Sequence, residues 1–316
     1  MRIVFCGNGF ASVSDFLGRR LDPAKDEVIV CADEQAIMAA APGAAVVIPG
    51  MYRIDAGLLD AGDFRLIQQW GAGVEGVDLD AARARGVWVA NVPAAGKNAE
   101  SVAEHVILLL LALLRRLPVA QANLRAGILG APMGRALAGL TICLYGLGHV
   151  AKALVQRLRA FDVNLIGLTR DPLAAKVPGF GLAAVYALQD RRACLSQTDV
   201  LVICTPLTEE TRGSIDDEAL AALPSGALVI NAARGPVVQY EALYETLVGG
   251  HLGGAGLDVF WTEPFPPDDP LLALPNVVAT PHVAGVTDLS YAEIADAVTI
   301  NIERLRRGES PLHRVA

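Results

Sequence analysis

Residues 140–171 constrain the fold more than any other part of this chain. An apolar run around Ile142–Tyr145 is followed by Gly146, Gly148 and Ala151, in the spacing G-x-G-x-x-A. This pattern predicts a strand, a tight turn and a helix, because the first glycine permits the turn and the small third residue lets the helix pack on the strand. The second glycine lets the backbone approach a pyrophosphate, which the N–H groups at the helix start would face. The segment therefore predicts a βαβ unit that binds a dinucleotide.

The end of the second strand of this unit, Val163–Leu168, bears on which dinucleotide is bound. Sites for NAD usually place an acidic side chain about 20 residues after the glycines, where it accepts hydrogen bonds from the ribose. Here Thr169, Arg170 and Asp171 follow the strand. If Thr169 holds the ribose position, Arg170 can pair with a 2′-phosphate, which favours NADP. If the strand runs two residues longer, Asp171 takes the ribose and NAD is favoured.

The length of 316 residues predicts two domains, and 53% hydrophobic residues suffice for two cores. A net charge of −8 gives no overall basic surface for nucleic acid.

The five cysteines form no C-x-x-C pair, as expected for reduced thiols, and no metal site is expected. Val106–Leu114 is the longest strongly apolar run and is too short to span a bilayer. The amino terminus lacks the apolar segment of a signal peptide, so we expect a cytoplasmic protein.

Residues 1–95 alternate apolar strands with helical or loop segments, which predicts a parallel, doubly wound α/β sheet. The expected strands are Arg2–Cys6, Val28–Cys31, Ala45–Ile48, Leu66–Trp70 and Val87–Asn91. Gly7, Gly9 and Ser12 after the first strand, with Asp33 further on, also resemble a dinucleotide turn. Bulky Phe10 and the lack of a long amphipathic helix make an ordinary βα turn the favoured interpretation.

Two further segments lie between this sheet and the glycine turn at Gly146. The three glycines in residues 69–78 expose consecutive N–H groups, which suits either an anion site or a plain tight turn. Asn98–Leu117 is predicted to be one long helix that is buried on several faces, between domains or at a dimer interface. His105 within this helix is interpreted as a core histidine.

Three strands are expected after the βαβ unit, at Val200–Cys204, Ala227–Asn231 and Gly254–Val259. They indicate a six-strand Rossmann pattern, with helices at Asp217–Ala222 and Tyr240–Val248. Ligands of open α/β sheets bind at the carboxyl ends of the strands. The polar strand ends are therefore expected to converge on the cofactor; they comprise Thr205 and Pro206, Asn231, Ala232 and Arg234, and Asp258. A helical tail over 288–307 is expected to return to the first domain.

Three ionisable residues near strand ends suit one reaction jointly, although each is weak evidence alone. The planar guanidinium of Arg234 can hold a carboxylate and polarise a keto oxygen. His282 can give a proton to that oxygen as hydride reaches carbon. The carboxylate of Glu263 can fix the tautomer of the imidazole. Together they indicate the reduction of a 2-keto acid.

The chain resembles the D-isomer-specific 2-hydroxyacid dehydrogenase family, which includes glyoxylate/hydroxypyruvate reductases, phosphoglycerate dehydrogenases and formate dehydrogenases. The resemblance covers nearly the whole chain, in the family's order and spacing. The motifs that carry it are GAGVEGVD, NAESVAEH, GRALAGLTICLYGLGHVA, CTPLTEETRG, INAARGPVV, GAGLDVFWTEP and NVVATPHVAG.

This resemblance implies two Rossmann-like or flavodoxin-like domains with an interdomain cleft. The substrate domain would comprise residues 1–95 and 286–316, and the dinucleotide-binding domain residues 96–285. A homodimer is implied, with the long helix near Val106 in its interface.

The resemblance also implies a role for each matched residue. Arg234 would bind the substrate, Glu263 would orient and tune His282, and His282 would be the general acid and base. The remaining implied contacts are substrate carboxylate at Ala72, Gly73 and Val74; pyrophosphate at Gly148, His149 and Val150; adenosine ribose at Thr169 and Arg170; the adenine side at Thr205 and Pro206; and the nicotinamide carboxamide at Asp258.

Departures from the family pattern leave the subfamily open. Ala151 replaces the third glycine of the turn, and the segment Ile128–Met133 lacks an aromatic residue that is frequent in the family. Thr169 replaces an acidic residue, which supports NADP.

The leading hypothesis is an NADP-preferring reductase of glyoxylate, hydroxypyruvate or a related 2-keto acid. Oxidation of phosphoglycerate, formate or phosphite, and a dinucleotide-sensing, corepressor-like interaction protein, are the alternatives. Joint retention of Arg234, Glu263 and His282 favours the enzyme.

Overall fold

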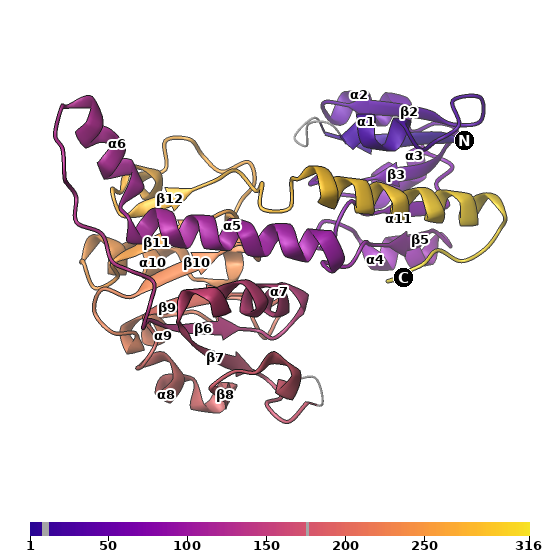
Figure 1. The fold of residues 1–316 in the computed structure, drawn as a ribbon. Helices are drawn as coiled ribbons and strands as arrows, with labels where there is room; N and C mark the ends of the chain where they lie inside the picture. The colour runs from indigo at the N-terminus through magenta and orange to yellow at the C-terminus, as the bar shows by residue number, and fades with distance from the viewer. Residues whose placement is uncertain (8–12, 175–176) are drawn as a thin grey trace. The chain divides into compact units, whose positions relative to one another are not determined.

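The computed structural model describes residues 1–7, 13–174 and 177–316. Within these ranges the chain divides into two compact units, shown in Figure 1. Unit 1 comprises Met1–Asn98 and Thr287–Ala316, and unit 2 comprises Ala99–Val286. The boundary expected at 95/96 lies three residues earlier than the first division, and the boundary expected at 285/286 lies one residue earlier than the second. Gly9, Phe10 and Ser12 of the first glycine turn lie outside the described residues.

Unit 1 is built on a parallel sheet in the order β2-β1-β3-β4-β5, as the alternating strands predicted. Its strands are β1 (Arg2–Cys6), β2 (Glu27–Cys31), β3 (Ala44–Ile48), β4 (Leu66–Gln68) and β5 (Trp88–Ala90). Its helices are α1 (Val13–Gly18), α2 (Glu34–Ala40), α3 (Ala56–Ala61), α4 (Leu79–Ala84) and α11 (Asp288–Arg306). Asp33, Asp55 and Asp78 cap α2, α3 and α4 by accepting from an N–H three residues on.

The carboxyl-terminal helix α11 belongs to unit 1, which confirms the expected return of the tail. Asn301 of α11 is buried and its amide donates to Gln68 Oε1 at 2.7 Å. Arg20 Nε, which follows α1, donates to Asp296 Oδ1 at 2.5 Å. Because both partners of the first bond are shielded from water, losing either would leave a buried polar group unpaired.

Unit 2 contains a parallel sheet in the order β12-β11-β10-β9-β6-β7-β8. Its strands are β6 (Thr141–Tyr145), β7 (Asn164–Thr169), β8 (Ala184–Ala187), β9 (Val200–Ile203), β10 (Leu228–Asn231), β11 (Gly254–Leu257) and β12 (Val277–Ala279). Its helices are α5 (Gly96–Leu114, whose first turn lies in unit 1), α6 (Leu117–Arg125), α7 (His149–Leu158), α8 (Arg191–Leu195), α9 (Asp217–Ala222) and α10 (Tyr240–Val248). Short 3-10 helices lie at Arg159–Phe161, Val177–Phe180, Leu188–Asp190, Gly235–Val237 and Pro270–Ala273.

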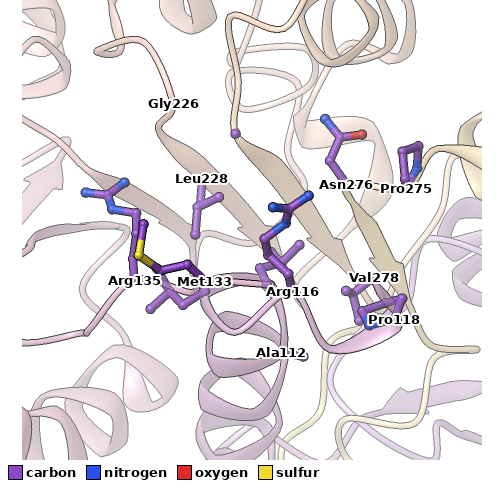
Figure 2. A pocket seen from close by; sticks show the side chains of 13 residues that line it. Ala112, Arg116, Pro118, Met133, Arg135, Gly226, Leu228, Pro275, Asn276 and Val278 are labelled. Carbon is purple, nitrogen blue, oxygen red and sulfur yellow. The ribbon is translucent and has the colours of Figure 1, made fainter. Parts of the chain in front are cut away.

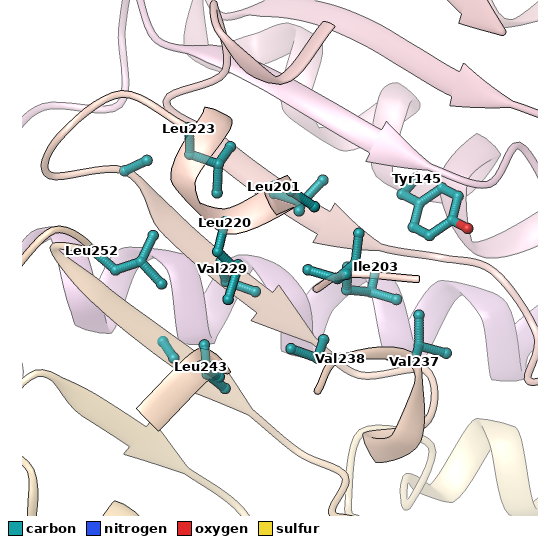
Figure 3. Packing of buried hydrophobic residues seen from close by; sticks show 14 of the residues in the cluster. Tyr145, Leu201, Ile203, Leu220, Leu223, Val229, Val237, Val238, Leu243 and Leu252 are labelled. Atoms are coloured by element: carbon teal, nitrogen blue, oxygen red, sulfur yellow. The ribbon is translucent and has the colours of Figure 1, made fainter. Parts of the chain in front are cut away.

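Side chains of a strand alternate between the two faces of a sheet. In unit 2 both faces carry apolar side chains, and helices cover both. On one face Tyr145, Leu201, Ile203 and Val229 pack with residues of α8, α9 and α10; Figure 3 shows this cluster. On the other face Ile142, Leu144, Val202 and Ile230 pack with α5 and α7. Burial of one such side chain contributes about 1.5–3 kcal/mol. A strand buried on both faces reads as a continuous apolar run, which is why the sequence located β6, β9 and β10.

Two expectations for this unit were wrong. The sequence indicated a six-strand pattern and located five strands, whereas the described part of the sheet has seven, because β8 and β12 were not located. Both are short edge strands, and neither forms the long apolar run that marked β6. The predicted helix over 98–117 begins earlier, at Gly96, and ends at Leu114, because Arg116 adopts a left-handed backbone conformation (φ 50°) that starts α6 separately.

No helix in the described ranges is long and apolar enough to cross a membrane. All five cysteines lie in the described residues as free thiols, and all except the half-buried Cys204 are buried.

Candidate active site

The glycine turn between β6 and α7 has the geometry that the motif predicted. Gly146 has φ +97°, and a Cβ there would lie 2.9 Å from the backbone of Thr205, so only glycine fits without a shift. Gly148 precedes the first residue of α7 and provides no side-chain cap. Gly148 and His149 are exposed. The turn thus presents uncapped N–H groups at a helix start, which suits a pyrophosphate.

Strand β7 ends at Thr169, which bears on the two alternatives for the cofactor. Asp171 lies beyond the strand, and its Oδ1 accepts from Leu173 N at 3.0 Å within the following turn. The Arg170 guanidinium extends into solvent, with 80% of its side chain exposed, and lies 3.2 Å from Glu210 Oε2. Such an exposed ion pair contributes at most about 1 kcal/mol, so Arg170 remains able to pair with another anion.

The loop after β10 places Arg234 beside the next strand. Asn231 is buried, and its side chain bonds both Ala233 N (3.1 Å) and Arg234 O (2.9 Å), which fixes the loop. Arg234 Nη1 donates to Ala233 O at 2.7 Å. A Cβ on Gly235 would overlap the carbonyl of Phe260, so glycine lets the Arg234 loop approach the loop after β11.

Glu263 and His282 form a hydrogen-bonded pair. The distance from His282 Nδ1 to Glu263 Oε2 is 2.6 Å, and Glu263 Oε1 accepts from Phe260 N at 2.9 Å. Burial alone would raise the pKa of Glu263, but the bond to His282, its charge, the Phe260 N–H and the charge of Arg234 together hold this pKa below its ordinary value. An ionised carboxylate only accepts, so Nδ1 carries a hydrogen, and a proton that His282 transfers would pass through Nε2.

The backbone of His282 is held in the left-handed region, at φ 54°. For a non-glycine residue this costs about 1–3 kcal/mol and persists only where the surroundings enforce it. His282 N donates to Asp258 O at 2.8 Å, and the buried Asp258 carboxylate bonds three groups of the same loop, described below. Strain of this kind is typical of functional sites.

Structure and sequence agree on which residues meet in unit 2. Arg234, Glu263 and His282 lie together, Gly146 abuts Thr205, and Asp258 lies against the His282 loop. Sequence reasoning missed Thr280. It interpreted His105 as a core histidine and named Asn231 only as a polar strand end, without the bonds that these two residues make. Only the position of Asn231 at a strand end, and of Thr280 beside His282, could have suggested them.

In unit 1, Ala72, Gly73 and Val74 form a turn after β4. Asn91 Nδ2 donates to Ala72 O at 2.7 Å, and Gln69 Nε2 donates to Gly73 O at 2.6 Å. Among the described residues the N–H groups of Ala72, Gly73 and Val74 donate to no acceptor. Such N–H groups suit an anion, but the substrate role of this turn stays a prediction.

A cavity of about 290 Å³ lies at the other edge of the unit 2 sheet. Its lining includes Leu228 and Val278 near the amino ends of β10 and β12, and Arg116, Met133 and Arg135 around α6 (Figure 2). Because the strands are parallel, this edge is opposite to the one that carries Asn231 and Asp258. The cavity is therefore separate from the candidate active site. Within the described residues no cluster of side chains suits a metal ion.

Comparison with known proteins supports the same family as the motifs. Residues 107–284 match the family model described as "D-isomer specific 2-hydroxyacid dehydrogenase, NAD binding domain". The chain is 34% identical to glyoxylate reductase of Korarchaeum cryptofilum over 82% of this chain and 78% of that protein. It is 36% identical to D-3-phosphoglycerate dehydrogenase of Mycobacterium tuberculosis over 85% of this chain and 51% of that protein. The chain thus spans about half the length of the phosphoglycerate dehydrogenases that it matches.

Among solved structures, the TT0316 protein of Thermus thermophilus superposes with a TM-score of 0.86 at 34% identity, covering all of both chains. The α/β fold with two parallel sheets is therefore shared with a protein of clear sequence similarity. The chain belongs to the D-isomer specific 2-hydroxyacid dehydrogenase family.

Proposed function

We propose that this protein reduces a small 2-keto acid, glyoxylate or hydroxypyruvate, to the D-2-hydroxy acid with NADPH or NADH. The observation that carries the proposal is the His282–Glu263 pair at 2.6 Å, with the charge of Arg234 acting on the same carboxylate. These groups follow the carboxyl ends of β10 to β12, where ligands of parallel α/β sheets bind. The similarity to the Korarchaeum glyoxylate reductase favours this substrate class.

The residues of unit 2 divide the reaction between them. Arg234 binds and polarises the keto acid through charge-assisted hydrogen bonds. Glu263 keeps a hydrogen on Nδ1 of His282, so that protonated His282 donates its Nε2 proton to the keto oxygen. A bound nicotinamide supplies the hydride that reduces the adjacent carbon. In the oxidative direction the neutral Nε2 accepts the hydroxyl proton.

The residues around the glycine turn fit a dinucleotide. A Cβ would fill the space beside Gly146, and the uncapped start of α7 offers N–H groups of His149 and Val150. Within this proposal NADP is preferred over NAD, because β7 ends at Thr169 and the exposed Arg170 follows it. The rest of the cofactor would contact the other strand ends, at Thr205, Pro206, Ala232 and Asp258. Arg170 would pair with the 2′-phosphate.

The experiment that tests the proposal is an initial-rate screen of small 2-keto acids with NADPH and NADH in parallel. It should include glyoxylate, hydroxypyruvate, pyruvate and 3-phosphohydroxypyruvate, with oxidation of formate and phosphite as separate arms. We expect the highest kcat/KM with glyoxylate or hydroxypyruvate. Turnover of none of the 2-keto acids would contradict the proposal and favour a dinucleotide-sensing protein.

Oxidation of 3-phosphoglycerate, with 3-phosphohydroxypyruvate as the keto acid, is the second candidate activity. It is favoured by the 36% identity to the phosphoglycerate dehydrogenase of Mycobacterium tuberculosis. The phosphohydroxypyruvate arm of the screen decides between the two activities, since a phosphorylated substrate would then have the highest kcat/KM.

We also propose that the protein forms a homodimer. Val106 of the long helix expected at the interface is buried in the core of unit 2, so we place the interface at the segment around α6, which follows this helix. None of the α6 residues is buried, and Leu124, Leu129 and Met133 are 70%, 84% and 91% exposed. A nine-residue helix with no fully buried residue is only marginally stable in water, and a second copy would bury its apolar side chains. Light scattering on the protein and on Leu129→Asp tests this: we expect a dimer and a monomer, respectively. A monomeric parent protein would contradict it.

A further inference from the structure

The Asp258 carboxylate at the end of β11 is fully buried and bonded by one loop. Its Oδ1 accepts from Thr280 Oγ1 at 2.7 Å and from Val283 N at 2.8 Å, and its Oδ2 accepts from Ala284 N at 2.8 Å. Its backbone carbonyl accepts from His282 N at 2.8 Å. The loop that carries His282 is therefore closed around one carboxylate, with bonds on both sides of the imidazole-bearing residue.

A side chain from the long helix α5 completes this arrangement. His105 Nε2 lies 2.8 Å from Thr280 Oγ1 and 3.5 Å from Asp258 Oδ1. The Thr280 hydroxyl has one hydrogen, which it donates to Asp258, so it accepts from an Nε2–H of His105. His105 itself is 13% exposed, and its neighbours Val106 and Leu109 are in the core of unit 2. The network is thus anchored on a packed helix.

The backbone conformation of His282 needs to be held in place by bonds to neighbouring residues. A φ of 54° is unfavourable for histidine and is retained only if neighbouring bonds enforce it. The bonds that enforce it include those made by the flanking Thr280, Val283 and Ala284, and all three of these end on the Asp258 carboxylate. If this backbone relaxed, the imidazole would move away from Glu263.

We propose that Asp258, Thr280 and His105 form a clamp, centred on a buried carboxylate, that positions the His282 imidazole against Glu263. The three are positioning residues, because they act through the backbone of His282. The effect of this clamp on catalysis rests on the proposed function, whereas the positioning of the imidazole does not. The clamp gives Asp258 a role in addition to the nicotinamide contact implied by the family resemblance, because both of its carboxylate oxygens accept bonds from the loop of His282.

The clamp is tested by Thr280→Val, which removes the hydroxyl and keeps the branched shape, with Thr280→Ser as the matched control that restores it. His105→Phe is the second variant, because it removes the Nε2 donor and leaves all bonds to Asp258 from the loop in place. Thermal unfolding establishes that each variant is folded, so that either one carries the test.

The first readout does not depend on activity. In the full chain labelled with ¹⁵N-histidine, the Nδ1–H of His282 bonded to Glu263 gives a low-field proton resonance, assigned by its loss in His282→Ala. We expect this resonance to be lost or broadened in Thr280→Val and in His105→Phe, and retained in Thr280→Ser. An unchanged resonance in the folded Thr280→Val and His105→Phe variants would overturn the proposal.

The second readout is kinetic and separates positioning from cofactor binding. Thr280→Val should lower kcat by about 10- to 100-fold, as a displaced catalytic group does, with little change in the KM for the keto acid. The Kd for NADPH should stay unchanged, and Thr280→Ser should restore kcat. If instead the Kd rises and kcat does not fall, Asp258 serves the cofactor and the clamp is refuted. If the parent protein reduces no keto acid but the resonance behaves as expected, the proposed function fails and the clamp stands.

Discussion

The two halves of the carboxyl edge of the unit 2 sheet differ in how their polar groups are used. At the β6–β7 half, the glycine turn offers uncapped N–H groups, and Arg170 is bonded only weakly to Glu210 at the surface. At the β10–β12 half, Asn231, Asp258 and Glu263 are bonded to the chain itself. The first half is arranged to receive a ligand, and the second to hold a side chain in place. Substitutions should therefore affect binding in the first half and turnover in the second.

The largest effect is expected at His282. His282→Ala should lower the turnover of a 2-keto acid by about 10²- to 10⁴-fold, the range typical for loss of a general acid. The Kd for NADPH, measured by fluorescence titration, should change little, because the side chain belongs to the β10–β12 half. Unchanged turnover would refute the role of His282.

The second effect is expected at Arg170. Arg170→Asp should shift the ratio of kcat/KM for NADPH and NADH toward NADH by about 10- to 100-fold, since a hydrogen bond to a charged group contributes about 1.5–3 kcal/mol. The matched control is Glu210→Gln, which removes the partner of Arg170 and keeps the guanidinium; it should retain the preference for NADPH. If both cofactors respond equally to Arg170→Asp, Arg170 does not bind the phosphate.

The two glycines of the turn provide a third, smaller contrast. Gly146→Ala should destabilise unit 2 by at least about 1–2 kcal/mol, because φ is +97° and the new Cβ meets the backbone of Thr205. Gly148→Ala meets no atom within 4 Å and has φ −101°, so its thermal midpoint should stay unchanged. If the pyrophosphate of NADPH lies against the backbone of Gly148, the added methyl group should nevertheless make this variant bind NADPH several-fold more weakly. Equal binding would place the pyrophosphate elsewhere.

The smallest effect is on stability in acid. The pKa of Glu263 in the folded protein lies below its ordinary value of 4.5, so its ionised form contributes stability that is present above that value and lost as pH falls through the folded pKa. Glu263→Gln should therefore lose less stability than the parent protein when the pH is lowered from about 5 to about 3. Parallel unfolding curves at the two pH values would show that the His282–Glu263 bond adds no such stability.

The sequence predicted the β6–β7 half of this edge better than the β10–β12 half. Gly146 and Gly148 carry a local signal, because turn, phosphate approach and helix start are adjacent in the chain. The contact between His105 and Thr280 joins residues 175 positions apart, and no local pattern announces it. Likewise β12 has only three residues, and its position next to β11 depends on pairing and not on its composition.

The three ionisable residues illustrate the same limit. Arg234, Glu263 and His282 were found because each follows a strand end, but the sequence alone could not show that Glu263 and His282 are bonded at 2.6 Å. Nor could it show that His282 has a left-handed backbone, since this conformation is imposed by bonds to Asp258 and not by the residue itself.

The most direct test of this account is a crystal structure of the protein with NADPH. We expect the pyrophosphate against the N–H groups of Gly148, His149 and Val150, the 2′-phosphate beside Arg170, and C4 of the nicotinamide next to Nε2 of His282. A dinucleotide bound away from the glycine turn, or a nicotinamide remote from His282, would contradict the claim that the two halves of this edge serve one hydride transfer.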